Sequence, residues 1–153
     1  MAIQLVPIDR NNYMECINLS VGEEQKRYVA PNSFSLAQAA YEPDMYPLAV
    51  YDGDQMVGFI LYDLDPDLEG WSMSRFMIDR SFQGKGLGKL ALDEFLRFFF
   101  AAYPADKLYT SVETDNPTAA ALYESRGFRC QETFEYDAGG EHYREMRMLL
   151  EKL

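Results

Sequence analysis

Histidine, cysteine and basic residues are scarce in this sequence. Histidine occurs once, at His142, and cysteine twice, at Cys16 and Cys130. A single histidine argues against Ser-His-Asp, Cys-His and HExxH chemistries, because each uses histidine as a base or a metal ligand. Two cysteines are too few for a disulfide framework and lack the spacing of a zinc ribbon. We therefore expect both to be buried as small hydrophobic side chains, and no metal to be bound.

Positive charge is also limited, since 14 Lys and Arg face 25 Asp and Glu, for a formal net charge of -11. This balance argues against a general nucleic-acid binder, which needs clustered basic residues to neutralise phosphates. The longest apolar run, 98–102, is too short to cross a bilayer, and the N-terminus lacks the pattern of a signal peptide. We expect a cytoplasmic protein with neither a nucleic-acid nor a membrane partner.

Apolar residues are plentiful, at 48% of the 153 residues, with 14% aromatics. This composition can bury a sizeable core. The length suits one domain, and no repeat, linker or low-complexity tract divides the chain. We predict a single domain spanning residues 1–153.

The hydrophobic pattern predicts alternating strands and helices. We expect strands at 3–6, 47–51, 56–64, 71–78, 108–112, 128–134 and 142–149, and helices at 9–19, 36–41, 86–103 and 117–125. Asp9 would cap the first helix, and Ser33 or Ser35 the second. The third carries an apolar stripe of Leu87, Ala91, Phe95, Phe98 and Ala102. The fold class is then α+β, with a mixed, mostly antiparallel sheet of about seven strands flanked by about four helices.

A glycine-rich loop, Gln-Gly-Lys-Gly-Leu-Gly-Lys at 83–89, lies between a predicted strand and the long helix. Its glycines are Gly84, Gly86 and Gly88, and its lysines are Lys85 and Lys89. Glycine permits tight turns and exposes backbone N–H groups at a helix start, where an anion can bind. The loop predicts a phosphate or pyrophosphate site; the plainer alternative is a strand-to-helix turn with solvated lysines.

Spacing separates three kinds of phosphate loop. A Walker A motif fails, because Lys89 stands where its second glycine belongs. The dinucleotide pattern G-x-G-x-x-G/A fits residues 86–91, and Glu113 lies near the place of a ribose-binding acid. A Rossmann half-domain, however, repeats parallel strand-helix units, whereas antiparallel strands are expected before this loop. A dinucleotide oxidoreductase stays open as an alternative.

The third pattern, Q-x-x-G-x-G, is filled by Gln83, Gly86 and Gly88, and a second block at 116–128 matches N-x-x-A-x-x-L-Y-x-x-x-G-F. Together they resemble the GCN5-related N-acetyltransferase (GNAT) family over nearly the whole chain. Three further stretches, 20–25, 32–36 and 75–79, look most like the Bacillus-type spermine/spermidine acetyltransferases.

The resemblance implies acetyl-CoA as co-substrate, with its pyrophosphate on the glycine-rich loop. The implied coenzyme-binding residues are Phe76, Met77, Ile78, Gln83, Gly84, Lys85, Gly86, Leu87, Gly88, Lys89, Asn116, Ala119 and Tyr123. Asn116 would hydrogen-bond the pantetheine arm, although an Asn at this position also suits a helix N-cap. A bulge in the strand before the loop would free backbone groups for the pantetheine and the acetyl carbonyl.

The implied catalytic residues are Tyr123, Met77 and Glu113. Tyr123 would protonate the leaving thiolate, a main-chain N–H near Met77 would stabilise the oxyanion, and Glu113 is the side-chain candidate for the base. The alternatives are a packed core tyrosine and an exposed strand-end carboxylate. A catalytically idle acyl-CoA-binding domain is a further reading of the whole chain.

Acidic loops indicate the acceptor. They are Glu23 and Glu24; Asp63, Asp65, Asp67 and Glu69; and Glu135, Asp137 and Glu141. If the first two groups flank the acceptor site, with Glu23 and Glu24 binding substrate, they favour a polycation such as spermidine or spermine. Solvated loops are the alternative, and arylamines, aminoglycosides, amino acids and protein N-termini suit the same coenzyme half. A homodimer is left open.

Overall fold

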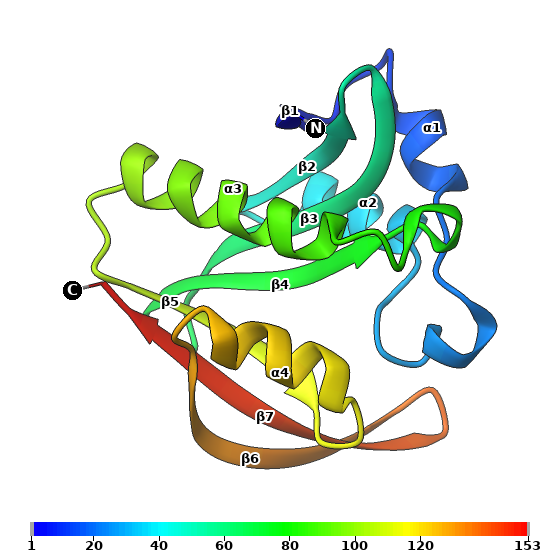
Figure 1. Ribbon diagram of the computed structural model, residues 1–153. Helices are drawn as coiled ribbons and strands as arrows, with labels where there is room; N and C mark the ends of the chain where they lie inside the picture. Colours follow the sequence, from blue (N-terminus) through cyan, green and yellow to red (C-terminus); the bar gives the residue numbers. More distant parts are fainter. Residues whose placement is uncertain (1, 153) are drawn as a thin grey trace.

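The computed structural model describes residues 2–152, which fold around one continuous sheet (Figure 1). Its strands are β1 (Ile3–Pro7), β2 (Met45–Asp52), β3 (Gln55–Asp65), β4 (Gly70–Ile78), β5 (Lys107–Glu113), β6 (Arg129–Ala138) and β7 (Glu141–Glu151). Within the described residues the helices are α1 (Tyr13–Asn18), α2 (Asn32–Tyr41), α3 (Leu87–Ala102) and α4 (Pro117–Ser125), with 3-10 turns at Glu23–Gln25 and Arg80–Phe82. The predicted α+β class and the order of its elements are confirmed.

The sheet is antiparallel apart from one pair of strands. Its strand order is β1-β2-β3-β4-β5-β7-β6, and only β4 and β5 run parallel. A parallel pair needs a crossover connection, which α3 provides. Helices α3 and α4 lie over one face of the sheet, and α1 and α2 over the other (Figure 1).

Helix α3 buries an apolar stripe against the sheet. Leu87, Ala91 and Phe95 are buried as predicted, and Phe99 is fully buried beside them. Phe98 is half-buried and packs against this core as predicted, but the prediction was wrong for Ala102, which is exposed because steps of four from Phe95 continue the stripe through Phe99. Each fully buried phenylalanine contributes roughly 1.5–3 kcal/mol, which holds the helix and the loop before it in place.

A second core lies under α1 and α2. It joins Cys16 to Phe59, Leu61 and Met77 of the central strands. Burial raises the pKa of the Cys16 thiol to about 12, so this cysteine is an inert core residue. The expectation for Cys130 was wrong, because β6 is an edge strand on which Cys130 is exposed.

The sheet opens between β4 and β5. These strands pair only at Ser72 with Tyr109 and at Met73 with Thr110, and then diverge. Beyond that point β4 carries the expected bulge: Leu61 faces Arg75 while Tyr62 faces Met73, so Ser74 is an extra residue. A bulge bends its strand and re-aims the side chains after it. The ends of β4 and β5 therefore become the walls of a cleft.

Two helix starts differ from the predictions. Helix α1 begins at Tyr13, because Asp9 instead accepts a hydrogen bond from the Asn11 backbone N–H (2.8 Å) in a tight turn. Helix α2 begins at Asn32, four residues before the expected start at Leu36 and directly after Pro31.

Candidate active site

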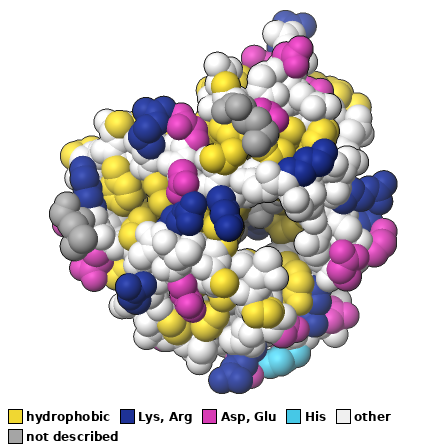
Figure 2. Space-filling model, viewed as in Figure 1, with side chains coloured by type: hydrophobic (Ala, Val, Ile, Leu, Met, Phe, Trp, Pro, Cys, Tyr) yellow, Lys and Arg dark blue, Asp and Glu magenta, His cyan; other side chains and the backbone are white. Residues whose placement is uncertain are grey.

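A cleft of about 1380 Å³ follows the opening between β4 and β5. It is bounded by the ends of these strands, the N-termini of α3 and α4, the segment 21–31 and the β6–β7 hairpin. Figure 2 shows the surface hollowed between α3 and α4, with Lys and Arg side chains beside the opening. Single-ligand pockets usually measure about 300–1,000 Å³, so this cleft can hold two reactants together.

At one end of the cleft, the glycine-rich loop presents its backbone. Gly84 and Gly86 have φ angles of +78° and +79°, a conformation that only glycine adopts without strain. Nothing lies within 4 Å of where a Cβ atom would stand at either glycine. Helix α3 begins at Leu87 without a side-chain cap, so the N–H groups of its first turn can bind an anion.

The side chains of this loop divide into two groups. Lys89 lines the cleft, whereas Lys85 does not and instead points its ammonium group over the Phe82 ring, 5.7 Å from the centroid. Gln83 is held in place, because its amide donates to the Ile78 carbonyl (2.8 Å) and to Gln25 Oε1 (3.0 Å). Gln83 therefore fixes the shape of the loop, an alternative to direct anion contact that sequence analysis did not consider.

The middle of the cleft holds the second sequence block. Asn116 caps α4, with its Oδ1 accepting from the Ala119 N–H (3.3 Å), and both residues line the cleft. One helical turn later, Tyr123 is 7% exposed and also faces the cleft, with its ring packed against Phe128. Burial raises the pKa of Tyr123 to about 12. The phenol is therefore protonated at neutral pH.

Across from α4, the last residues of β4 line the same space. Phe76, Met77 and Ile78 all contribute to the wall. The Met77 side chain turns away into the second core, where Asn32 donates to its sulfur (3.8 Å). The end of β4 no longer pairs with β5, so its backbone N–H and C=O groups on that side are free to bind a ligand.

The far end of the cleft is acidic. Glu113 at the end of β5 is 5% exposed, and Glu145 faces it from β7 in the strand register. Burial raises the pKa of Glu113, and the charge of Glu145 raises it further, while Arg27 lowers it. A buried carboxylate with a raised pKa can accept a proton, which makes Glu113 a candidate base.

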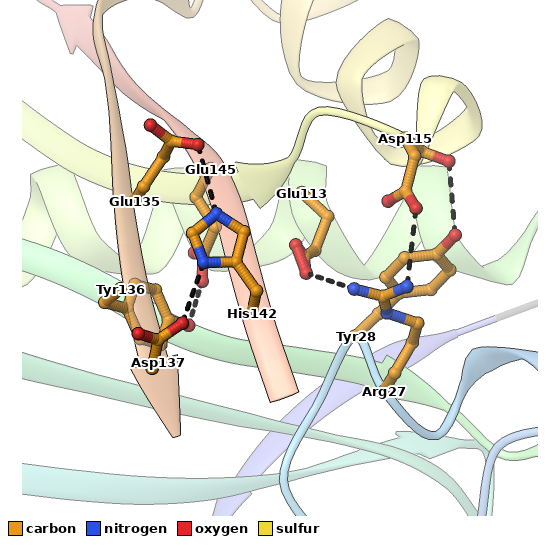
Figure 3. A network of polar contacts seen from close by, with 9 residues as sticks. All are labelled: Arg27, Tyr28, Glu113, Asp115, Glu135, Tyr136, Asp137, His142 and Glu145. Carbon is orange, nitrogen blue, oxygen red and sulfur yellow. Dashed lines mark hydrogen bonds and ion pairs between the residues drawn. The ribbon is translucent and has the colours of Figure 1, made fainter. Parts of the chain in front are cut away.

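Aromatic rings complete the acidic end. Tyr136 and Tyr143, on the β6–β7 hairpin, stack with centroids 5.2 Å apart, and both line the cleft. The Tyr136 hydroxyl donates to Glu145 (Figure 3). Nearby, His142 lies between Asp137 (2.8 Å) and Glu135 (3.1 Å), and these hydrogen bonds raise the pKa of the imidazole.

Two of the predicted site residues lie outside the cleft, and several unpredicted ones lie inside it. Glu24 lines the cleft, whereas Glu23 and Lys85 do not; Glu23 pairs with Lys26 (2.7 Å) on the surface. Asp63, from the second acidic group, is buried and accepts a hydrogen bond from Ser74. The residues that sequence analysis missed are Arg27, Tyr28, Asp115, Tyr136, Tyr143 and Glu145. Among them, only Asp115 had a local signal, its place beside Asn116.

Neither a membrane-spanning helix nor a cluster of metal ligands is found in the described part of the chain. Within residues 2–152, no helix combines the length and apolar character needed to cross a membrane. In the same part of the chain, no group of three or more His, Cys, Asp and Glu side chains is arranged to hold a metal ion.

Comparison with known proteins identifies the family. Residues 11–128 match the model of the acetyltransferase (GNAT) family. The spermine/spermidine N(1)-acetyltransferase of Bacillus subtilis is 30% identical over 148 residues, which cover 92% of this chain and 95% of that protein.

Solved structures of enzymes that are named for different acceptors share this fold. The spermidine N-acetyltransferase of Vibrio cholerae, solved with CoA and spermine, superposes with a TM-score of 0.77 at 18% identity, covering 98% of this chain and 95% of that one. The ribosomal-protein-S18-alanine N-acetyltransferase of Escherichia coli gives 0.75 at 17% identity, with coverage of 99% and 96%. The fold is thus common to enzymes for small and protein amines. From the family match over most of its length and from the Bacillus relative, the chain belongs to the GNAT family of N-acetyltransferases.

Proposed function

We propose that this enzyme transfers the acetyl group of acetyl-CoA directly to a primary amine of a polyamine such as spermidine or spermine. The observation that carries the choice of acceptor is the cluster of Glu113, Asp115 and Glu145 at the far end of the cleft. Three carboxylates beside stacked tyrosines suit an extended polycation, because they combine charge attraction with cation–π contact. The identity to the Bacillus spermine/spermidine enzyme points the same way.

The residues of the glycine-rich loop fit coenzyme A. The open space at Gly84 and Gly86 and the uncapped start of α3 suit a pyrophosphate, with Lys89 adding positive charge. The diverging end of β4 leaves backbone groups along Phe76–Ile78 for the pantetheine arm. Bound acetyl-CoA supplies an activated acetyl thioester. For the transfer to an amine, the residues of the chain orient the two reactants and move the protons.

Proton transfer is assigned to two groups. The Tyr123 phenol, protonated because burial raises its pKa, donates to the leaving thiolate. An aliphatic ammonium with a pKa of about 10.4 costs roughly 4–5 kcal/mol to deprotonate near pH 7. Glu113 is the group assigned to take that proton, and a backbone N–H near Met77 stabilises the oxyanion.

A panel of amines tests this function. The purified chain is mixed with acetyl-CoA and spermidine, spermine, a monoamine, an aminoglycoside or an N-terminal alanine peptide, and release of free thiol is followed. We expect the highest kcat/KM with a polyamine. A preference for the peptide would overturn the choice of acceptor. Coenzyme A binding without thiol release from any amine would instead identify a non-catalytic acyl-CoA-binding domain.

A further inference from the structure

Arg27 places a positive charge of the chain itself in the acidic end of the cleft. Its Nη2 atom lies 3.4 Å from Glu113 Oε1, and its Nη1 atom lies 3.6 Å from Asp115 Oδ2. Figure 3 shows Arg27 beside Tyr28, Glu113 and Asp115. The guanidinium carbon lies 6.0 Å from the Tyr28 ring centroid and 5.6 Å from that of Tyr143. Two carboxylates and two aromatic rings form a binding site for an organic cation. We call these four residues, Glu113, Asp115, Tyr28 and Tyr143, the cation cage.

The guanidinium is held loosely in this cage. Charge-assisted N–H···O bonds usually measure about 2.7–2.9 Å, so both of its contacts are long. The Arg27 side chain is 42% exposed, whereas that of Glu113 is 5% exposed. Arg27 can therefore exchange the cage for water at low cost, while Glu113 stays buried and needs a positive partner.

The backbone around Arg27 is fixed independently of the guanidinium. On one side, Gln25 Oε1 accepts from Gln83 in the glycine-rich loop (3.0 Å). On the other side, the Tyr28 hydroxyl donates to the Asp115 carbonyl (3.1 Å). The side chain can thus leave the cage while the segment that carries it remains in place.

We propose, on the basis of the polyamine function proposed above, that Arg27 is a specificity-determining residue whose guanidinium competes with a charged nitrogen of the acceptor for the cation cage. A polyamine keeps a second ammonium group when its reacting nitrogen becomes neutral, and that group replaces the guanidinium. A monoamine has no second charge and leaves Arg27 in place. Glu113 can serve both the cage and the reacting amine, because a carboxylate has two oxygens and only Oε1 contacts Arg27.

Substitution of Arg27 measures this competition. In Arg27→Gln the KM for spermidine falls about fivefold, the equivalent of one moderate ion pair, while the KM for butylamine changes less than twofold. The matched control is Arg97→Gln, which removes the same charge from an exposed pair on α3 outside the cleft and leaves both values unchanged. Arg27→Lys keeps a competing cation and holds the spermidine KM near that of the unmodified enzyme.

Free guanidinium ion provides a second test, in which the same variant is measured with and without the added ion. At millimolar concentration it raises the spermidine KM of Arg27→Gln by refilling the cage, and it has little effect on the unmodified enzyme. If Arg27→Gln does not fold, Arg27→Lys replaces it, because an ammonium lacks the guanidinium fork and yields to guanidinium ion more readily.

The pH profile separates competition from a merely structural role. Glu113 faces Arg27, Asp115 and Glu145, and Glu145 is in turn bonded by Tyr136. Because Arg27 is the positive group among them in the free enzyme, its removal moves the ascending limb of kcat/KM to higher pH. The limb of kcat with spermidine stays in place, because the bound ammonium has already replaced the guanidinium, and Arg97→Gln moves neither limb.

The outcomes are distinct. Absence of polyamine turnover by the unmodified chain refutes the proposed function and this inference together. Polyamine turnover with an unchanged or raised spermidine KM in Arg27→Gln refutes the role of Arg27 alone.

Discussion

Replacing Tyr123 with phenylalanine removes the hydroxyl group of Tyr123 and keeps its ring. The ring packs against Phe128, with centroids 5.7 Å apart, so the packing of α4 on the sheet should survive. What disappears is a buried phenol, 7% exposed, whose pKa is raised to about 12. The phenol carries its proton at every pH below about 11, so it can act as an acid and does not by itself limit the rate at alkaline pH.

Two magnitudes follow from this geometry. Removing the hydroxyl of a buried tyrosine costs about 0.5–1.5 kcal/mol of folding stability, the contribution of one hydrogen bond. Loss of a positioned general acid costs about 10²–10⁴ in rate, equivalent to roughly 3–5 kcal/mol of transition-state stabilisation. The kcat should therefore fall much further than stability can explain, while the affinity for coenzyme A stays within about twofold, because the loop proposed to bind its pyrophosphate is untouched.

Thiol release under saturating acetyl-CoA measures kcat, and calorimetry measures coenzyme affinity. Tyr62→Phe is the matched control, since Tyr62 is also buried and loses a hydroxyl hydrogen bond, to Tyr103 (2.8 Å), on the α3 side. Both variants should lose similar stability in denaturant, and only Tyr123→Phe should lose rate. A Tyr123→Phe enzyme with full kcat would show that another group protonates the thiolate.

Three other substitutions test separate parts of the cleft. Gly86→Ala forces a left-handed residue at a cost of about 1–2 kcal/mol, and calorimetry should find coenzyme A binding weakened by at least fivefold. Gly58→Ala places a Cβ atom 2.5 Å from the Met77 carbonyl oxygen; we expect about 1–3 kcal/mol less stability in denaturant and a raised KM for acetyl-CoA. Glu113→Gln should lower kcat by about 10²–10⁴ and abolish the ascending limb of its pH profile. Because folding raises the pKa of Glu113, ionisation of this group opposes folding as the pH rises through that pKa, so the Gln variant should be at least as stable at pH 7 in thermal unfolding.

The shape of the half of the cleft proposed to bind coenzyme A was predictable because its signals are local. Gly84 and Gly86 lie within one turn, and their left-handed φ angles are a property of glycine itself. Likewise, the predicted helix at 117–125 matches the observed bounds of α4, where Asn116 and Pro117 mark the start.

Apart from Glu24 and Glu113, the residues of the half proposed to bind the acceptor could not be predicted, because they meet only through the fold. Arg27 and Glu113 are 86 positions apart, and Glu145 faces Glu113 solely through the register of β5 and β7. The hairpin of β6 and β7 was predicted, but β6 is exposed along nearly its whole length, so no buried face specifies the register of its pairing. The sequence shows where acidic residues cluster along the chain, but it does not show which of them reach the cleft.

The two walls of the opening between β4 and β5 also differ in the kind of group that they present to a ligand. The β4 side offers peptide groups that are free of pairing with β5, and these survive most replacements of their own side chains. On the β5–β7 side they are carboxylates, rings and a guanidinium, each of which one codon change can delete. Mutational drift can therefore redirect such an enzyme toward another amine while its acetyl donor stays the same.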